Sequence, residues 1–181
     1  RAFEASGHKA WSNDLIPCSD GSRWHLQMDC LRAIDLFEWD LIIMHPPCTS
    51  LAVSGNRWYG RGTPGEQQRA EALRWTSNLW EKAKSVCSRV AMENPVGVLP
   101  HAIGPGTQYI QPWEFGHPET KKTGLWLHGL PALVPTNVMP PPHANRVWKM
   151  PPGPDRQRLR SQTYQGIADA MASQWGELCY P

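Results

Sequence analysis

An apolar run that ends in two prolines constrains this chain more than any other feature. Residues 39–44 (WDLIIM) are mostly of strand-forming types, and residues 45–49 (HPPCT) follow them. Because proline lacks the amide hydrogen that a β-ladder needs, the run predicts a buried central strand that ends in a rigid turn. Ligands bind at the carboxyl edge of an open α/β sheet, which makes Cys48 a candidate catalytic residue. The alternative is that Cys48 is a small buried hydrophobic residue, as many cysteines are.

A second segment repeats this pattern about forty-five residues later. Residues 89–92 (RVAM) predict a short strand, and Glu93, Asn94 and Pro95 follow it. A carboxylate at the end of a neighbouring strand can face the cysteine. A nucleophile and an acid at adjacent strand ends form a catalytic pair, so Cys48 and Glu93 are paired as candidates.

Length and composition set outer bounds on the class of protein. A chain of 181 residues suffices for one α/β domain with a real core. The net charge of +2 is too small to indicate a nucleic-acid binder by itself. The five cysteines are odd in number and form no Cys-x-x-Cys pair, which argues against a disulfide framework or a metal site and favours a reducing, cytoplasmic location. No apolar run approaches the roughly 20 residues that a membrane helix needs, and no leader is expected, so we expect a soluble protein without membrane partners.

Taken together, these motifs resemble the cytosine carbon-5 methyltransferases, which use S-adenosylmethionine. That family places its nucleophile in a Pro-Cys turn, matched here by Pro47-Cys48, and carries a later Glu-Asn pair, matched by Glu93-Asn94. The ordered set of residues 45–55, 93–97, 111–117 and 121–127 is similar to short methyltransferase-like proteins of phages and prophages that lack a target-recognition domain. The resemblance covers nearly the whole chain.

The resemblance implies a Rossmann-like, doubly wound and mostly parallel sheet in a three-layer α/β/α fold of the class I methyltransferase type. Its first strand, with the glycine-rich turn that holds the methionine moiety, would precede Arg1 or be lost. We expect a single domain over residues 1–181, made of a catalytic core (1–127), a proline-rich wrapping segment (128–160) and a closing helix (161–178).

Cofactor-binding residues follow from the same resemblance. Asp14, at the end of a strand expected over residues 9–14, would bind the ribose hydroxyls of S-adenosylmethionine, and Asp29 would contact the adenine amino group. From the residues alone, a solvated turn aspartate is the favoured interpretation of Asp14. Asp29 is equally the N-cap of a helix over residues 30–37, a role compatible with adenine binding. The cofactor set implied by the resemblance is Asp14, Leu15, Asp29, Cys30, His45 and Pro46.

Catalytic and substrate-binding residues are implied in the same way. Cys48 would attack carbon 6 of cytosine, Glu93 would hold the ring, and Asn94 belongs to the same catalytic set. Lys122 lies where longer relatives carry a glutamine-and-arginine segment against the base, without matching it. Residues 50–62 are glycine-rich and predict a mobile loop over the base, although its arginines and aromatics are also ordinary in a loop. The implied substrate-binding set is Pro47, Thr49, Ser54, Arg57 and Trp58.

Helices are expected at two further places. Thr63-Pro64-Gly65-Glu66 predicts a capping box before a crossover helix, whose core positions are Leu73, Trp80, Ala83 and Cys87. Ile167, Met171 and Trp175 share one face of a last helix over residues 166–175. Between these helices, a strand is expected over residues 108–115 and another over residues 124–127. Residues 130–154 predict extended wrapping with one edge strand at 146–150, and Arg156, Arg158 and Arg160 form a basic cluster.

Three functions remain open at this point. The first is methylation of cytosine, carried either by DNA or by a free nucleotide, with a homodimer or a partner chain as a source of sequence recognition. The second is a non-catalytic nucleotide- or nucleic-acid-binding protein. The third is transfer of another one-carbon group to the same pyrimidine position, because the chemistry of Cys48 does not choose the electrophile.

Overall fold

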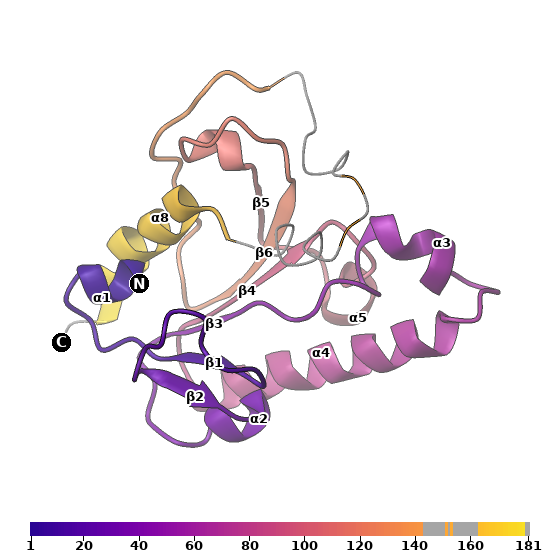
Figure 1. The fold of residues 1–181 in the computed structure, drawn as a ribbon, viewed down its shortest axis with the longest axis horizontal. Helices are drawn as coiled ribbons and strands as arrows, with labels where there is room; N and C mark the ends of the chain where they lie inside the picture. Colours follow the sequence, from indigo (N-terminus) through magenta and orange to yellow (C-terminus); the bar gives the residue numbers. More distant parts are fainter. Residues whose placement is uncertain (143–150, 152, 154–162, 180–181) are drawn as a thin grey trace.

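The strands form two separate sheets in the structure, a computed structural model that describes residues 1–142, 151, 153 and 163–179. β1 (Ser12–Asp14) and β2 (His25–Gln27) make a small parallel pair, and α2 (Cys30–Ala33) follows it. The larger sheet has the order β3-β4-β6-β5, with β3 (Ile42–Met44), β4 (Val90–Pro95), β5 (Gln108–Ile110) and β6 (Thr123–His128). Figure 1 shows the small pair at one side of the larger sheet.

The expected mostly parallel, doubly wound three-layer fold is wrong. Within the four-stranded sheet only β3 and β4 are parallel, because β6 runs antiparallel to both β4 and β5. No crossover helix separates β5 from β6, and antiparallel neighbours need none, so these strands can pair directly. β1 is three residues long and exposed throughout, which gives it no apolar face to place within the larger sheet.

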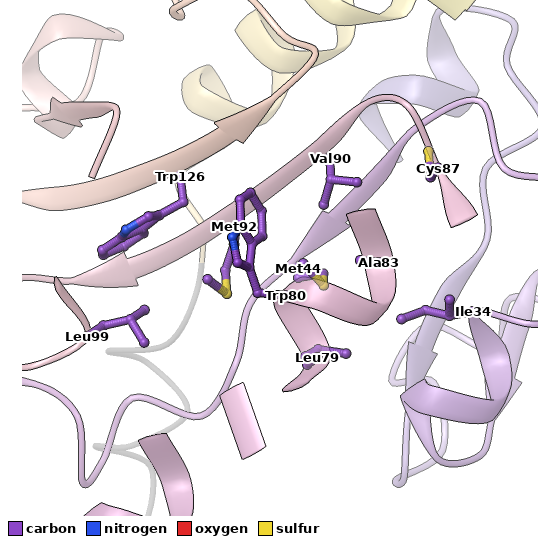
Figure 2. Packing of buried hydrophobic residues seen from close by; sticks show 10 residues of the cluster. All are labelled: Ile34, Met44, Leu79, Trp80, Ala83, Cys87, Val90, Met92, Leu99 and Trp126. Atoms are coloured by element: carbon purple, nitrogen blue, oxygen red, sulfur yellow. The ribbon is translucent and has the colours of Figure 1, made fainter. Parts of the chain in front are cut away.

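The parallel pair β3–β4 is joined by α4 (Glu66–Val86), as the expected crossover helix requires. α4 packs on one face of the sheet with α2 and α5 (Pro100–Ile103) (Figure 1). Figure 2 shows the cluster on this face, in which Trp80 and Ala83 of α4 meet Val90 and Met92 of β4. The predicted core positions of the helix are therefore confirmed, with Leu73 partly buried against the same cluster.

The opposite face of the sheet is covered by α8 (Gln165–Gly176), with α1 (Ala2–Ala5) beside it (Figure 1). Ile167, Met171 and Trp175 of α8 are buried here, as the helical spacing predicts. Ala91 of β4 belongs to this second cluster, whereas its neighbours Val90 and Met92 belong to the first. Because side chains alternate along a strand, Glu93 points to the α8 side and Asn94 to the α4 side.

The start of α4 differs from the predicted capping box. The Thr63 hydroxyl donates to the carbonyls of Trp58 (2.7 Å) and Gly60 (2.8 Å) and does not accept from the helix amides. Glu66 accepts instead from the Gly62 amide at 2.7 Å. The helix begins after Gly65 without a side-chain cap, because Thr63 is used to close the preceding turn.

Other predicted elements are present with different bounds: β1, β3 and α2 are shorter than expected, whereas β4, β6 and α8 extend beyond the expected residues. The strand expected over residues 108–115 ends at Ile110 and continues as a 3₁₀ helix over Pro112–Glu114, because proline cannot donate to the ladder. The loop expected over residues 50–62 contains a 3₁₀ helix, Val53–Gly55, and α3 (Asn56–Tyr59). A last 3₁₀ helix, Glu177–Cys179, follows α8.

The proline-rich segment is described only over part of its length. Residues 129–142 run without a helix or strand, and Asn137 makes a single bridge to Phe115. The edge strand expected at residues 146–150 and the cluster of Arg156, Arg158 and Arg160 lie outside the described residues. The domain division stays a prediction.

Two findings bear on the class of protein. Over the described ranges, the longest apolar stretches of helix are too short or too polar to span a bilayer. All five cysteines lie within these ranges and are thiols.

Candidate functional site

The turn that follows β3 holds Cys48 at the carboxyl edge of the sheet. Pro46 is buried beneath the turn, and Cys48 itself is half-buried. The amides of Leu51 and Ala52 donate to the Cys48 carbonyl at 3.0 and 2.9 Å, which closes a tight turn immediately after the cysteine. Cys48 follows the end of β3 as predicted, but β3 is the edge strand of its sheet and only Met44 of its three residues is buried, so the expected buried central strand is wrong.

Asn94 ties the neighbouring strand β4 to this turn. Its Nδ2 donates to the carbonyl of Pro46 at 3.0 Å, and the side chain is only 1 % exposed. Its Oδ1 atom is also buried and accepts no hydrogen bond from the described residues. One amide therefore fixes the Pro-Pro-Cys turn against the end of β4.

The segments that follow β3 and β4 are also hydrogen-bonded to each other. Val53 donates to Val96 at 3.0 Å, and Val98 donates to Leu51 at 2.9 Å, so residues 51–53 and 96–98 pair along a short stretch. We call this pairing the loop clamp. Gly97 lies at its centre, where a Cβ atom would be 2.0 Å from the Leu51 carbonyl oxygen. Only glycine permits this approach.

Glu93 meets His45 across the two strand ends. Nδ1 of His45 lies 3.1 Å from Oε2 of Glu93, and the Glu93 side chain is 18 % exposed. Burial favours the neutral carboxyl, but the hydrogen bond and attraction of His45, the charge of Lys121 and the Thr123 hydroxyl outweigh it. The pKa of Glu93 is therefore held below its ordinary value, and the carboxylate is ionised at neutral pH.

Glu93 also borders a cleft between the sheet and the start of α8. We call it the Glu93 cleft, and its polar side chains are Glu93, Lys121, Thr123, Thr163 and Tyr164. Its floor is apolar and is formed by Ile110, Ile167 and Met171. The space within the cleft is only about 10 Å³, which is room for about one water molecule.

The two lysines before β6 take different positions. Lys121 borders the Glu93 cleft, and its Nζ lies 5.9 Å from the ring centroid of Tyr164. Nζ of Lys122 instead lies 5.0 Å from the ring centroid of Tyr109. The structure thus brings Lys121 to Glu93, and it does not bring Lys122 there.

His117 organises the opening of α8. Its Nε2 accepts from the Gly166 amide at 2.9 Å, and its ring lies 5.1 Å from that of Tyr164. The contact gives this loop histidine a structural role, because it satisfies an amide in the first turn of the helix that forms one wall of the Glu93 cleft.

The substrate-binding candidates lie in the turn that holds Cys48 and in the loop that follows it. Pro47, Thr49 and Ser54 are exposed, and Trp58 on α3 is 64 % exposed. The Arg57 guanidinium lies 5.2 Å from the Trp58 ring centroid. These side chains present polar, cationic and aromatic groups beyond Cys48, but no described contact joins them to Glu93.

The remaining cofactor candidates lie at the end of the small β1–β2 pair. Asp14 accepts from the Leu15 amide at 2.7 Å, and Asp29 caps α2 by accepting from the Leu31 amide at 2.8 Å. Both structural roles that the residues alone predicted are therefore present. Burial raises the pKa of Cys30, and the negative charges of Asp29 and Asp14 raise it further.

The structure thus brings together one group of predicted residues: His45, Pro46, Cys48, Glu93 and Asn94. A second group, Asp14, Leu15, Asp29 and Cys30, gathers at the other sheet. Sequence reasoning missed Lys121, Thr123 and Tyr164, although alternation along β6 could have indicated that Thr123 faces the same side as Leu125. Within the described ranges no group of His, Cys, Asp or Glu has the arrangement of a metal site.

Comparison with known proteins adds no relative: no family model, curated protein or solved structure matches this chain.

We expect the Glu93 contacts to make stability depend on pH. A folded-state pKa below the ordinary value of 4.5 stabilises the fold above that pH, and this contribution is lost as the pH falls through the folded-state value. The Glu93→Gln variant should therefore unfold about 1–2 kcal/mol more easily than the unmodified protein at pH 7, with a smaller difference at pH 4 and below. Urea unfolding at several pH values measures both.

Glu38→Gln is a matched control, since Glu38 is exposed and makes no described contact. A difference for Glu93→Gln that stays constant from pH 7 to pH 3 would contradict this account of the carboxylate.

Proposed function

We propose that this protein is an S-adenosylmethionine-dependent methyltransferase that acts on carbon 5 of cytosine through a covalent adduct on Cys48. The observation that carries the proposal is the joining of two neighbouring strand ends, where Asn94 holds the Pro46 carbonyl at 3.0 Å and the loop clamp pairs the chains beyond. This arrangement keeps a thiol and an ionised acid at one edge of the sheet. It is supported by the Pro47-Cys48 and Glu93-Asn94 motifs of the resembled family.

Cys48 would act as the nucleophile. Carbon 5 of cytosine is a weak nucleophile, and attack by the thiolate on carbon 6 forms an S–C6 bond and moves the ring electron pair to carbon 5. After carbon 5 has gained its methyl group, a base removes the proton from carbon 5. The electrons of that C–H bond then restore the C5–C6 double bond, and the thiolate leaves.

Glu93 would hold the ring while this charge develops. An ionised carboxylate accepts hydrogen bonds from the exocyclic amine and from a protonated ring nitrogen 3, and it thereby favours protonation as the thiolate adds. His45 orients the carboxylate through its 3.1 Å contact. Lys121 lines the same small cleft and adds a positive charge beside the Glu93 carboxylate.

We assign the adenosine half of the cofactor to the β1–β2 end of the molecule. Asp14 and Asp29 each accept from backbone amides, and a carboxylate has capacity for further donors such as ribose hydroxyls or an adenine amine. The apolar residues Leu15 and Ile16 follow Asp14 in the sequence, and they are 69 % and 66 % exposed. Bound S-adenosylmethionine would supply the methyl group that carbon 5 accepts.

The cytosine that is methylated belongs either to a free nucleotide or to DNA. Exposed Arg57 and Trp58 offer a cation and a stacking surface, which suit either a nucleotide phosphate and base or an extruded base in DNA. Sequence recognition by a partner chain or by a second copy of this chain belongs to the same proposal.

Mass spectrometry of the intact protein tests the proposal. The protein is incubated with S-adenosylmethionine and 5-fluorocytosine, supplied as the deoxynucleotide or within a DNA duplex, because fluorine at carbon 5 blocks the final elimination. We expect a trapped adduct with one carrier, which names the substrate class. Absence of an adduct with both carriers would overturn the proposal, and absence of cofactor binding in calorimetry would favour the non-catalytic nucleotide- or nucleic-acid-binding protein.

A further inference from the structure

Arg69 reaches from α4 to the loop that carries Cys48. Its Nε donates to the carbonyl of Ser50 at 2.6 Å, and its Nη1 donates to Oδ1 of Asn56 at 2.9 Å. Ser50 is 6 % exposed and lies two residues after Cys48, while Asn56 begins α3. One guanidinium thus joins the Cys48 turn to the helix that presents Arg57 and Trp58.

The loop is packed closely around this guanidinium. A Cβ atom on Gly55 would lie 2.5 Å from the Thr49 carbonyl oxygen and 3.6 Å from Nη2 of Arg69. Residues 49, 55 and 69 are therefore in near contact, and the loop passes over the guanidinium. The planar shape of this group suits two acceptors in fixed directions, which an ammonium group does not match as well.

One donor of Arg69 is left over. Nη2 is buried and has no hydrogen-bond partner among the described residues. A guanidinium that served stability alone would be expected to have its buried donors paired, because an unpaired buried donor is costly. A cation with spare donor capacity beside a cysteine turn instead suits a role in the chemistry of that cysteine.

We propose that Arg69 is the positioning residue of Cys48: it fixes the turn through the Ser50 carbonyl, two residues after the cysteine, and brings a permanent positive charge to that turn. The charge favours the thiolate, since cations near a cysteine stabilise its ionised form. The inference rests on the proposed function for its meaning in catalysis, but the reactivity of Cys48 can be measured without any substrate.

Two variants of the same helix provide the test. Arg69→Met removes both hydrogen bonds and the charge, and Arg74→Met is the matched control, because Arg74 lies on the exposed side of α4 and makes no described contact. Alkylation by iodoacetamide is followed at each cysteine by peptide mass spectrometry across a pH series, with Cys18 as the internal reference. We expect the pH midpoint for Cys48 to rise in Arg69→Met and to stay unchanged in Arg74→Met.

The same variants are then compared in the 5-fluorocytosine assay. We expect the maximal rate of adduct formation to fall about 10- to 100-fold in Arg69→Met, with little change in the substrate concentration at half-saturation, because a misplaced nucleophile slows the chemical step. Arg69→Lys keeps the charge and one hydrogen bond and should partly restore both readouts.

Unchanged alkylation at Cys48 in folded Arg69→Met would overturn the inference, whatever the adduct assay gives. If Arg69→Met fails to fold, Arg69→Gln decides, because its amide keeps a hydrogen-bond donor but carries no charge: an unchanged pH midpoint at Cys48 in that variant would also overturn the inference. If the unmodified protein forms no adduct with either carrier, the proposed function fails, and the alkylation result still decides the role of Arg69.

Discussion

Replacement of Cys48 by alanine is expected to abolish the covalent adduct with 5-fluorocytosine. The thiolate supplies the bond to carbon 6, and no other group at this edge of the sheet can replace it. Loss of a nucleophile in an assembled catalytic site lowers the rate by at least about a thousand-fold. Time-resolved mass spectrometry of the intact protein, followed by peptide mapping, measures both the rate and the position of the adduct.

Cys18→Ala is the control for this substitution. Cys18 is half-buried and contacts Asp20 at the far side of the β1–β2 pair, so its loss should leave adduct formation unchanged. An adduct that persists in Cys48→Ala, or that maps to Cys18, would show that the nucleophile had been assigned to the wrong residue.

Replacement of Gly97 by alanine is expected to open the loop clamp. The added Cβ would meet the Leu51 carbonyl oxygen at 2.0 Å and the Leu51 carbonyl carbon at 2.8 Å, and backbone atoms cannot rotate away as a side chain can. Overpacking of this kind costs about 3 kcal/mol. Separation of the two loops would also shift the Cys48 turn away from Glu93, so adduct formation should fall more than the folded fraction does.

Urea unfolding measures the loss of stability in Gly97→Ala. The rate of adduct formation per folded molecule measures the effect of moving the Cys48 turn away from Glu93. Gly106→Ala is the matched control, because the nearest atoms to its Cβ lie at 3.5 Å, an ordinary contact distance. A Gly97→Ala protein as stable as Gly106→Ala would mean that the two loops can part without cost and that their pairing does not hold the site.

The site was partly predictable because its main signals are local. Two apolar runs that each end in proline mark the ends of β3 and β4, and they place Cys48 and Glu93 at one edge once the two strands are parallel neighbours. Helical spacing likewise identified Trp175 as a buried residue of the last helix. Such patterns depend on the period of one element alone.

Features that depend on contacts between distant segments were not predictable. The antiparallel direction of β6 is set by its pairing with β4 and β5, and nothing within residues 123–128 encodes it. The choice of Lys121 over Lys122 depends on which lysine faces α8, and Arg69 looks like a surface residue of α4 until its contact with Ser50 is known. The Gly97 requirement is similar, because it arises from the approach of Leu51, forty-six residues earlier.

The alternation along β4 has a consequence for how this gene can vary. Glu93 and Asn94 are adjacent, yet they serve opposite faces of the sheet, one toward the cleft and one toward the Pro46 carbonyl. Point substitutions at Val90 or Met92 alter packing and leave this assignment in place. Deletion or insertion of one codon within the strand would exchange acid and amide between the two faces. Descendants of this sequence should therefore accept changes of residue in β4 far more readily than changes of its length.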